Sequence, residues 1–480
     1  MSRSAKGLLV MGAVALAGCW SSEPAEISQI PDEQPVVVVS ATPLRGQALA
    51  VVLEPRMRHN QVHGVMVGDG TSDNAGPAAL VHVRAEAPDR AAVVTSALEP
   101  GPKRIERVGD ALLVWTHDDH HGGFSAAVYG PKPTPAIAVA VFSADALAPR
   151  GQRTFAPGLE QPVGLAGADF VVDLPRSGHS DSARDVRLVA HALDPKRPSR
   201  TLFEARGYQS TACRGGASAA VAFEPALGVA GSSESVRVVS VAASGDRADV
   251  AGASITGYRL RVDVPLSCSS ASRWVAVPVW RAKDGVPCVL HVDAEGGFVA
   301  RVLERAATPA FLSDDGEGVA ARADGAAETQ VVPRAGAPSA VPGSALGFAS
   351  NRLYFRDRVV DLTTGEVTLL ARPLPACRGV APWGRRGIAC VANVEGSRRM
   401  GVWAARAEGR VDLVAERSDL DAYSWLDLLG VEGDTAWVLD HDRPQTLAAI
   451  DLARGSLVLA APRPACDTGD IERHHGCTVH

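Results

Sequence analysis

Short apolar segments alternate with polar turns along most of the chain, from about residue 46 onward. The segments 352–355, 358–362 and 367–370, for example, are separated by short stretches that contain Asp, Arg, Thr and Gly. The apolar spacing of an amphipathic helix is almost absent from the same region. Short apolar runs bounded by turn-forming residues are typical of antiparallel strands joined by tight turns. The pattern therefore predicts an all-β protein.

The predicted hairpins recur at a nearly constant interval. Three turn glycines, Gly365, Gly409 and Gly455, lie 44 and 46 residues apart. Fainter hairpins have turns near Asp89, Asp145, Asp194, Gly245 and Gly296. A repeat of about 40–50 residues built from strands is the signature of a β-propeller, in which four-stranded blades pack on one another. The repeat predicts a β-propeller of seven or eight four-stranded blades.

Tandem β-sandwich domains are the alternative fold, because they also contain many short strands. A sandwich, however, has no physical reason to repeat its turn at intervals of 44 and 46 residues. The regular interval favours the propeller.

Two segments of the C-terminal part resemble known propeller families. Residues 353–367, which contain Leu-Tyr-Phe followed by Asp-Leu-Thr-Thr-Gly-Glu-Val, resemble blades of quinoprotein-like propellers. Residues 381–392 resemble the strand–turn–strand of TolB-type propellers, in which a Trp precedes the turn, although the Pro-Asp pair of that turn is absent here. These resemblances imply a propeller architecture and carry no catalytic residues.

The first eighteen residues have the layout of a secretory signal peptide. Arg3 and Lys6 precede an apolar run at 7–16, and no acidic residue occurs before Cys19. The run is too short to cross a bilayer, which requires about 20 apolar residues. We therefore expect an exported protein.

The segment Leu16-Ala17-Gly18-Cys19 resembles the lipobox of bacterial lipoproteins. The resemblance implies cleavage before Cys19, a thioether-linked diacylglycerol on its sulfur and an acyl chain on its amino group. Such lipids would anchor the chain to a membrane. The alternative is an ordinary cleaved signal peptide followed by a coincidental cysteine. Trp20, where an Asp would favour the inner membrane, favours the outer membrane, on its periplasmic face or at the cell surface.

Four regions follow from these patterns. Residues 1–18 are the signal peptide, and 19–45 are a flexible tether rich in Ser, Glu and Pro. The run of valines at 36–39 interrupts this tether and favours a strand. Residues 46–463 form the propeller, and 464–480 form a C-terminal tail that a disulfide could staple.

Seven cysteines follow Cys19, and in an exported protein they favour disulfides. No two are spaced as Cys-x-x-Cys, which disfavours a metal site made of cysteines. Three close pairs suggest themselves, each worth about 3 kcal/mol if unstrained. They are Cys268–Cys288, Cys377–Cys390 and Cys466–Cys477, with Cys213 left over or able to replace a partner in the 268–288 region.

Histidines supply the candidates for a metal site. His117 and His120 lie in a polar run directly after the apolar segment 112–115, and His59 and His63 are four residues apart. Imidazole and carboxylate ligands suit a divalent ion such as Zn²⁺. A solvated loop tip is the simpler explanation of the 117–121 run, because adjacent residues converge on one ion only in a tightly folded loop. The metal case would improve if His82 met these residues.

No nucleophile elbow, phosphate-binding loop or dinucleotide fingerprint occurs in the chain. The net charge of −6, which becomes −8 without Arg3 and Lys6, gives no basic footprint for nucleic acid. The sequence therefore favours a binding or scaffold module of the cell envelope with a protein or glycan partner, and no cofactor is predicted beyond the lipid on Cys19. The alternative is a propeller enzyme, a hydrolase or lyase, with a site in the central channel that could depend on a metal.

Overall fold

The computed structural model describes residues 36–466 with internal gaps. The gaps are 56–59, 63–64, 68–77, 86, 99–102, 109, 117–136, 156–158, 166–169, 176–183, 193–195, 216–217, 227–233, 245–246, 263, 265, 270–272, 325–326, 395–398, 418–425, 441–445, 455 and 462–464. Within the described ranges every regular element is a β-strand. These ranges hold no helix of the length and apolarity that a membrane crossing requires.

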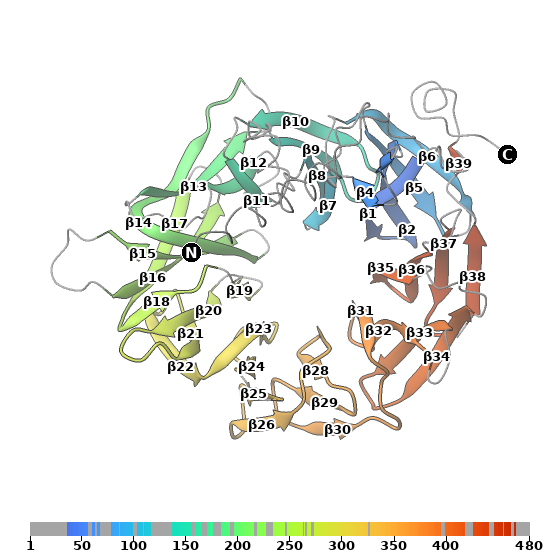
Figure 1. The fold of residues 1–480 in the computed structure, drawn as a ribbon. Coiled ribbons are helices and arrows are strands. Elements are labelled where there is room, and N and C mark those ends of the chain that lie inside the picture. Colours follow the sequence, from blue (N-terminus) through green and yellow to red (C-terminus); the bar gives the residue numbers. More distant parts are fainter. Residues whose placement is uncertain are drawn as a thin grey trace, which may run out of the picture.

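Eight antiparallel sheets stand around a common centre, so the chain is an eight-bladed β-propeller (Figure 1). This arrangement confirms the predicted fold, and the tandem-sandwich alternative is wrong. In blades 1, 2 and 5–8 the first strand lies toward the centre and the last strand lies at the periphery (Figure 1).

The strands follow the blades in chain order. Blade 1 contains β1 (Val36–Leu44), β2 (Ala48–Pro55), β5 (Ala78–Arg84) and β6 (Ala87–Leu98), and blade 2 contains β7 (Lys103–Val108), β8 (Ala111–Thr116), β9 (Ile137–Ser143) and β10 (Pro149–Phe155). Blade 3 contains β11 (Leu159–Leu165), β12 (Phe170–Pro175), β13 (Arg184–Ala192), β14 (Arg200–Gly215), β15 (Ser218–Pro225), β16 (Ser235–Ser244) and β17 (Arg247–Thr256). Blade 4 contains β18 (Tyr258–Leu260), β19 (Ser267–Cys268), β20 (Trp274–Arg281), β21 (Pro287–Asp293) and β22 (Phe298–Glu304).

The second half of the ring is more uniform. Blade 5 contains β23 (Ala306–Leu312), β24 (Val319–Ala323), β25 (Glu328–Val332) and β26 (Ser339–Pro342), and blade 6 contains β27 (Gly347–Ala349), β28 (Arg352–Tyr354), β29 (Arg358–Asp361) and β30 (Val367–Leu369). Blade 7 contains β31 (Cys377–Trp383), β32 (Gly387–Asn393), β33 (Met400–Arg406) and β34 (Val411–Arg417), and blade 8 contains β35 (Leu426–Glu432), β36 (Thr435–Asp440), β37 (Thr446–Asp451) and β38 (Ser456–Ala461). A separate hairpin pairs β3 (Asn60–Val62) with β4 (Val65–Val67).

Both faces of a blade are buried by its neighbours, which explains the nearly continuous apolar runs in the middle strands. Ala389 and Val391 on β32 pack with Val438 on β36 in one cluster between blades 7 and 8. On the other face of the same strand, Ile388 and Cys390 pack with blade 6. A short segment that is apolar on both faces therefore indicates a strand buried between two blades. It does not indicate a membrane-spanning segment or a helix.

Blade 3 departs from the four-stranded pattern because one strand serves two partners. The sixteen-residue strand β14 pairs with β13 through its first half and with β15 through its second half. Gly207 lies at the changeover, opposite both Arg184 and Pro225. The two halves of the blade pack together through a cluster that includes Leu188 and Phe223.

The ring closes by packing between blade 1 and blade 8. Leu49 and Val81 of blade 1 share a core cluster with Trp437 and Leu447 of blade 8. At the periphery, β39 (Ala465–Cys466) pairs in parallel with β6 and so adds a fifth strand to blade 1. Strand β1 begins at Val36, so part of the segment assigned to the tether belongs to the propeller, and β39 lies in the segment assigned to the tail.

Most of the predicted turns that the structure describes join the last two strands of a blade. Gly296, Gly365 and Gly409 lie in such turns, whereas Asp89 lies within β6. The long interval between 296 and 365 contains the whole of blade 5, whose corresponding turn carries Gly336 at a φ of 117°. The sequence repeat missed this blade because its turn lies in a stretch rich in Gly, Pro and Ala.

The disulfides agree with the prediction in one case and correct it in another. Cys377 is bonded to Cys390, as predicted. Cys268 is bonded to Cys213, so the predicted Cys268–Cys288 pair is wrong, and Cys288 is a buried free thiol. The reason is topological: β20 lies between β19 and β21, which holds Cys268 and Cys288 two strand spacings apart. Cys477 lies outside the described residues, so the Cys466–Cys477 pair stays a prediction.

Candidate functional site

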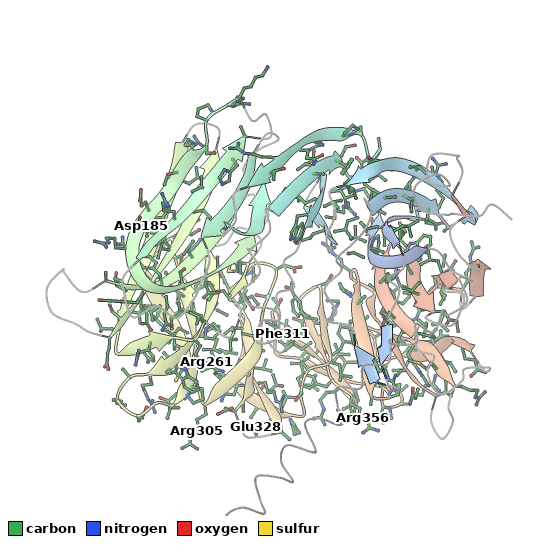
Figure 2. All side chains as sticks on the ribbon, turned by 45° about the horizontal axis from the view of Figure 1, so that its top comes forward. Asp185, Arg261, Arg305, Phe311, Glu328 and Arg356 are labelled. Carbon is green, nitrogen blue, oxygen red and sulfur yellow. A yellow bond between two sulfur atoms is a disulfide. The ribbon has the colours of Figure 1, made fainter. Side chains whose placement is uncertain are left out.

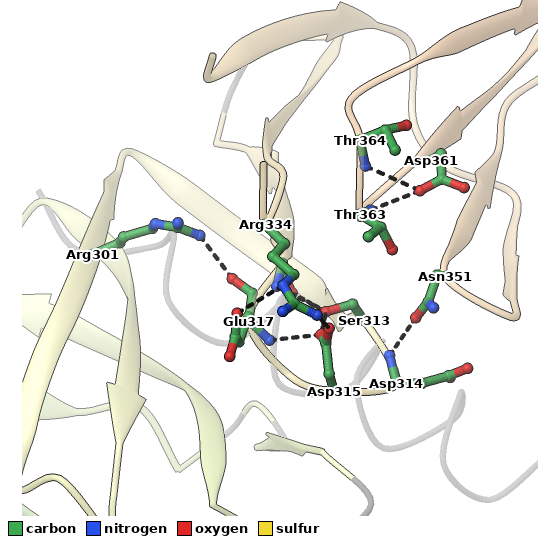
Figure 3. Close-up of polar contacts among 11 residues, drawn as sticks. Arg301, Ser313, Asp314, Asp315, Glu317, Arg334, Asn351, Asp361, Thr363 and Thr364 are labelled. Atoms are coloured by element: carbon green, nitrogen blue, oxygen red, sulfur yellow. Dashed lines mark hydrogen bonds and ion pairs between the residues drawn. The ribbon is translucent and has the colours of Figure 1, made fainter. Parts of the chain in front are cut away.

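A network of polar contacts lies where blades 4, 5 and 6 meet. It is built around the loop 313–318, which joins β23 to β24 (Figure 3). Side chains from the neighbouring blades reach this loop from both sides. We call it the 313–318 loop.

The loop holds its own shape through Ser313 and Asp315. The Ser313 hydroxyl donates to Asp315 Oδ1 at 2.5 Å and accepts from the Gly318 N–H at 2.8 Å. The Glu317 N–H also donates to Asp315 Oδ1, at 3.0 Å. Burial raises the pKa of Asp315, but its hydrogen bonds and the neighbouring guanidinium of Arg334 outweigh this effect and lower the pKa below its usual value. Asp315 is therefore a carboxylate at neutral pH.

Arginines and an asparagine tie the loop to its surroundings (Figure 3). Arg334, in the turn between β25 and β26, donates to Asp315 Oδ2 at 2.8 Å and lies 3.0 Å from a Glu317 carboxylate oxygen. Arg301 of blade 4 donates to the Glu317 carbonyl at 2.8 Å. Asn351 of blade 6 accepts from the Asp314 N–H. The loop is thus held by three blades.

A buried histidine meets the loop from blade 4. His291 on β21 is 0% exposed, and its Nε2 lies 2.7 Å from the Gly316 carbonyl oxygen. Its ring stacks on Trp274, with centroids 4.6 Å apart and an interplanar angle of 26°. Gly316 has a φ of 80°, and a Cβ there would come within 2.5 Å of the Trp274 Cβ. The loop therefore fits tightly over this pair of rings.

These groups position the loop and are not arranged as an acid–base pair. Asp315 and Glu317 both form ion pairs with Arg334, and His291 is buried away from solvent. Within the described ranges, no three His, Cys, Asp or Glu side chains converge in a way that could hold a metal ion.

An aromatic side chain of blade 5 lies near the centre of the ring. Phe311 on β23 lies near that centre, whereas Arg305, Glu328 and Arg356 lie along one margin of the molecule (Figure 2). The Phe311 ring is 6.0 Å from that of Phe348 on β27. Two aromatic rings therefore lie on the inner strands of blades 5 and 6.

The outer rim presents large apolar side chains to solvent. Leu369 on β30 is 71% exposed and Phe298 on β22 is 51% exposed. Val302 on β22, Val367 on β30 and Val250 on β17 are also exposed. All five lie on the last, outermost strand of a blade. We call this set the rim residues.

The residues singled out from the sequence are mostly not part of these features. Cys19, His59, His63, His117 and His120 lie outside the described residues, so lipidation and the metal site stay predictions. His82 is half-buried on β5, where burial and then Arg84 lower its pKa.

The 313–318 loop was missed by sequence reasoning. Its run Ser-Asp-Asp-Gly-Glu-Gly indicates only a turn. Its partners Arg301, Arg334 and Asn351 come from three other turns or strands, and only the packing of the blades brings them together.

Comparisons with known proteins found distant structural similarities only. No protein-family model and no curated protein matches the chain. A crystal structure described as the eukaryotic initiation factor is similar at 12% identity and a TM-score of 0.45, covering 84% of this chain and 91% of that one. Hsv2 of Kluyveromyces lactis is similar at 11% identity and a TM-score of 0.36, covering 80% and 99%. Hydrazine synthase of Kuenenia stuttgartiensis is similar at 13% identity and a TM-score of 0.32, covering 77% and 97%. The differing names of these proteins select no activity for this chain.

Proposed function

We propose that the chain is a lipid-anchored lipoprotein of the bacterial cell envelope whose propeller binds a partner protein along its outer rim. The anchor rests on Leu16-Ala17-Gly18-Cys19, at the end of an apolar run with a basic start. The binding role rests on one observation, the exposure of the rim residues on outermost strands.

The chemistry of the rim favours a protein over a glycan. The five rim residues are four aliphatic side chains and one phenyl ring, and such groups gain free energy when they leave water. An outermost strand also has a free edge of backbone N–H and C=O groups, to which an extended segment of another protein can add.

Site-specific photo-crosslinking in the cell tests the binding role. A photoreactive residue at Leu369 or Phe298 should give a discrete adduct that protease treatment removes. The same residue at Arg385, exposed in the turn between β31 and β32, is the matched control and should give none. Adducts that are equally frequent at Arg385, or that resist protease, would contradict a protein partner at the rim.

The anchor is tested separately. Cys19→Ala should leave an exported protein that no longer needs detergent for extraction from the membrane fraction. Extraction that still requires detergent would show that another feature holds the protein at the membrane, without bearing on the rim.

A further inference from the structure

His291 is a buried titratable group that links two blades. It lies on β21 of blade 4, and its Nε2 faces the Gly316 carbonyl of blade 5 at 2.7 Å. A carbonyl oxygen can only accept, so Nε2 must carry the proton of this bond. In the neutral ring, Nδ1 is then an acceptor.

Nδ1 of His291 has no hydrogen-bond partner and is closed off from solvent. An unpaired acceptor in this position carries only the desolvation cost of a neutral group while the ring is neutral. A proton on Nδ1 would create a buried cation with an unpaired N–H, which is far more costly. The buried position of the ring therefore favours the neutral imidazole over the charged imidazolium.

The charged groups around His291 come from each element that packs near it. Asp293 is two residues further along β21, and Arg273, just before β20, neutralises it at 2.8 Å. Arg301 lies opposite His291 on β22 and points to the loop. Asp315 and Glu317 on the loop are both held by Arg334. The nearby carboxylates are therefore already paired, and none of them contacts the imidazole.

We propose that His291 is an acid-operated latch, whose protonation releases the 313–318 loop from blade 4. The charged ring can regain water only by breaking the bond to Gly316 and leaving the stack on Trp274. Release of that contact loosens the loop, while the strands of the blades keep their own hydrogen bonds.

The direction of the pH dependence follows from the environment of the ring. Burial, and to a lesser extent Arg301, lower the pKa of His291 from 6.5 to about 4, against the raising effects of the Gly316 bond and Asp293. The released ring has the ordinary value of 6.5. The latched state is therefore fully favoured above pH 6.5 and loses its advantage as the pH falls from 6.5 toward 4.

Hydrogen exchange of the loop amides, corrected for the intrinsic effect of pH, tests the latch. Protection at Gly316 and Gly318 should fall roughly tenfold per pH unit below 6.5 and level off near pH 4. Far-UV circular dichroism should stay unchanged over this range. His291→Gln, whose amide can still donate to Gly316, should keep constant protection, and Asp315→Asn should retain the fall.

A fall of equal size in His291→Gln, or one that occurs only together with loss of circular dichroism, would overturn the latch. If His291→Gln fails to fold, NMR of histidine-labelled wild-type protein gives an independent test. A histidine that titrates near pH 4 and is neutral as the Nε2–H tautomer supports the latch. Titration of every folded-state histidine near 6.5 refutes it.

Discussion

Pro43 fills the space that Gly430 leaves open where the ring closes. A Cβ at Gly430 would come within 2.7 Å of the Pro43 Cγ, and Gly430 has a φ of 146°. Pro43 belongs to the first inner strand, β1, and Gly430 to the last, β35. The preceding interface repeats the arrangement less tightly, with Leu428 3.6 Å from the Cβ position of Gly379. Glycines thus let successive inner strands approach closely.

Gly430→Ala should destabilise the protein by about 1–3 kcal/mol, because the new methyl group meets a rigid proline ring. Urea unfolding measures the loss. Gly433→Ala is the matched control, since Gly433 also has a positive φ but nothing lies within 4 Å of its Cβ position. Pro43→Ala combined with Gly430→Ala should recover at least about 0.5 kcal/mol relative to the sum of the single changes. Strict additivity would contradict the contact.

The strands and most hairpins of this fold were predictable because their signals are local. Apolar runs that end in Asp or Gly turns mark single hairpins, and Gly365 and Gly409 both lie in such turns. The seven-stranded blade 3 was not predictable, because nothing local says that β14 continues past Gly207 to a second partner. The number of blades agrees with the prediction, although the strands are distributed among them differently.

The polar features needed tertiary information. The pairing of Cys377 with Cys390 is between adjacent strands and could be predicted from their short separation of 13 residues. Cys213 and Cys268 are 55 residues apart and come from neighbouring blades, so sequence proximity gave the wrong partner. In the sequence, His291 is a lone histidine in an apolar segment. Its contact with Gly316 forms only when blades 4 and 5 pack together.

Removal of the Cys213–Cys268 disulfide should cost more stability than removal of Cys377–Cys390. The first closes a separation of 55 residues between two blades and the second one of 13 within a blade. From the loss of chain entropy in the unfolded state, we expect a stabilisation of about 4 kcal/mol for Cys213–Cys268 and about 3 kcal/mol for Cys377–Cys390. Paired Ser substitutions at each bridge, compared by urea unfolding, measure the difference. A larger loss from the Cys377–Cys390 pair would contradict it.

Cys288 gives a chemical check on the same pairing. Its thiol is buried, and burial raises its pKa, so it should resist alkylation in the native protein. When the protein is unfolded without reductant, alkylated and mapped by peptide analysis, Cys288 should be alkylated and Cys268 should remain in its disulfide. Alkylated Cys268 with blocked Cys288 would restore the pairing predicted from sequence.

Asp293→Asn should destabilise the protein by about 1–3 kcal/mol at pH 7. Asp293 is 2% exposed and accepts from Arg273 and from the Gly296 N–H, at 2.8 Å in each case. Burial raises its pKa, but these bonds lower it below 3.8 overall. Its contribution to stability is therefore present above pH 3.8 and is lost as the pH falls through the folded-state pKa.

Urea unfolding at several pH values measures the difference in the free energy of unfolding between wild type and Asp293→Asn. This difference should become smaller below pH 4. Glu295→Gln is the control, because Glu295 is exposed in the same hairpin and lies 3.7 Å from Arg273. Its effect should stay within about 1 kcal/mol. A difference that does not change with pH would mean that Asp293 stabilises the protein through packing and not through its charge.

Gly207 is a further position where the absence of a side chain permits close packing. A Cβ there would come within 2.7 Å of the Glu224 carbonyl oxygen, 3.1 Å of the Phe223 ring and 3.2 Å of Val186. Phe223 and Glu224 lie on β15 and Val186 lies on β13, so strand residues stand on both sides of the changeover in β14. The strand has no room to move away from both halves of blade 3 at once.

Gly207→Ala should therefore destabilise the protein by about 1–3 kcal/mol. Arg206→Ala, at the exposed neighbouring position, should change the free energy of unfolding by no more than about 0.5 kcal/mol. Hydrogen exchange should place the loss of protection in β13 and β15, on both sides of Gly207. Loss confined to β13 would mean that the two halves of blade 3 are stabilised independently, since only a shared strand transmits the clash to both.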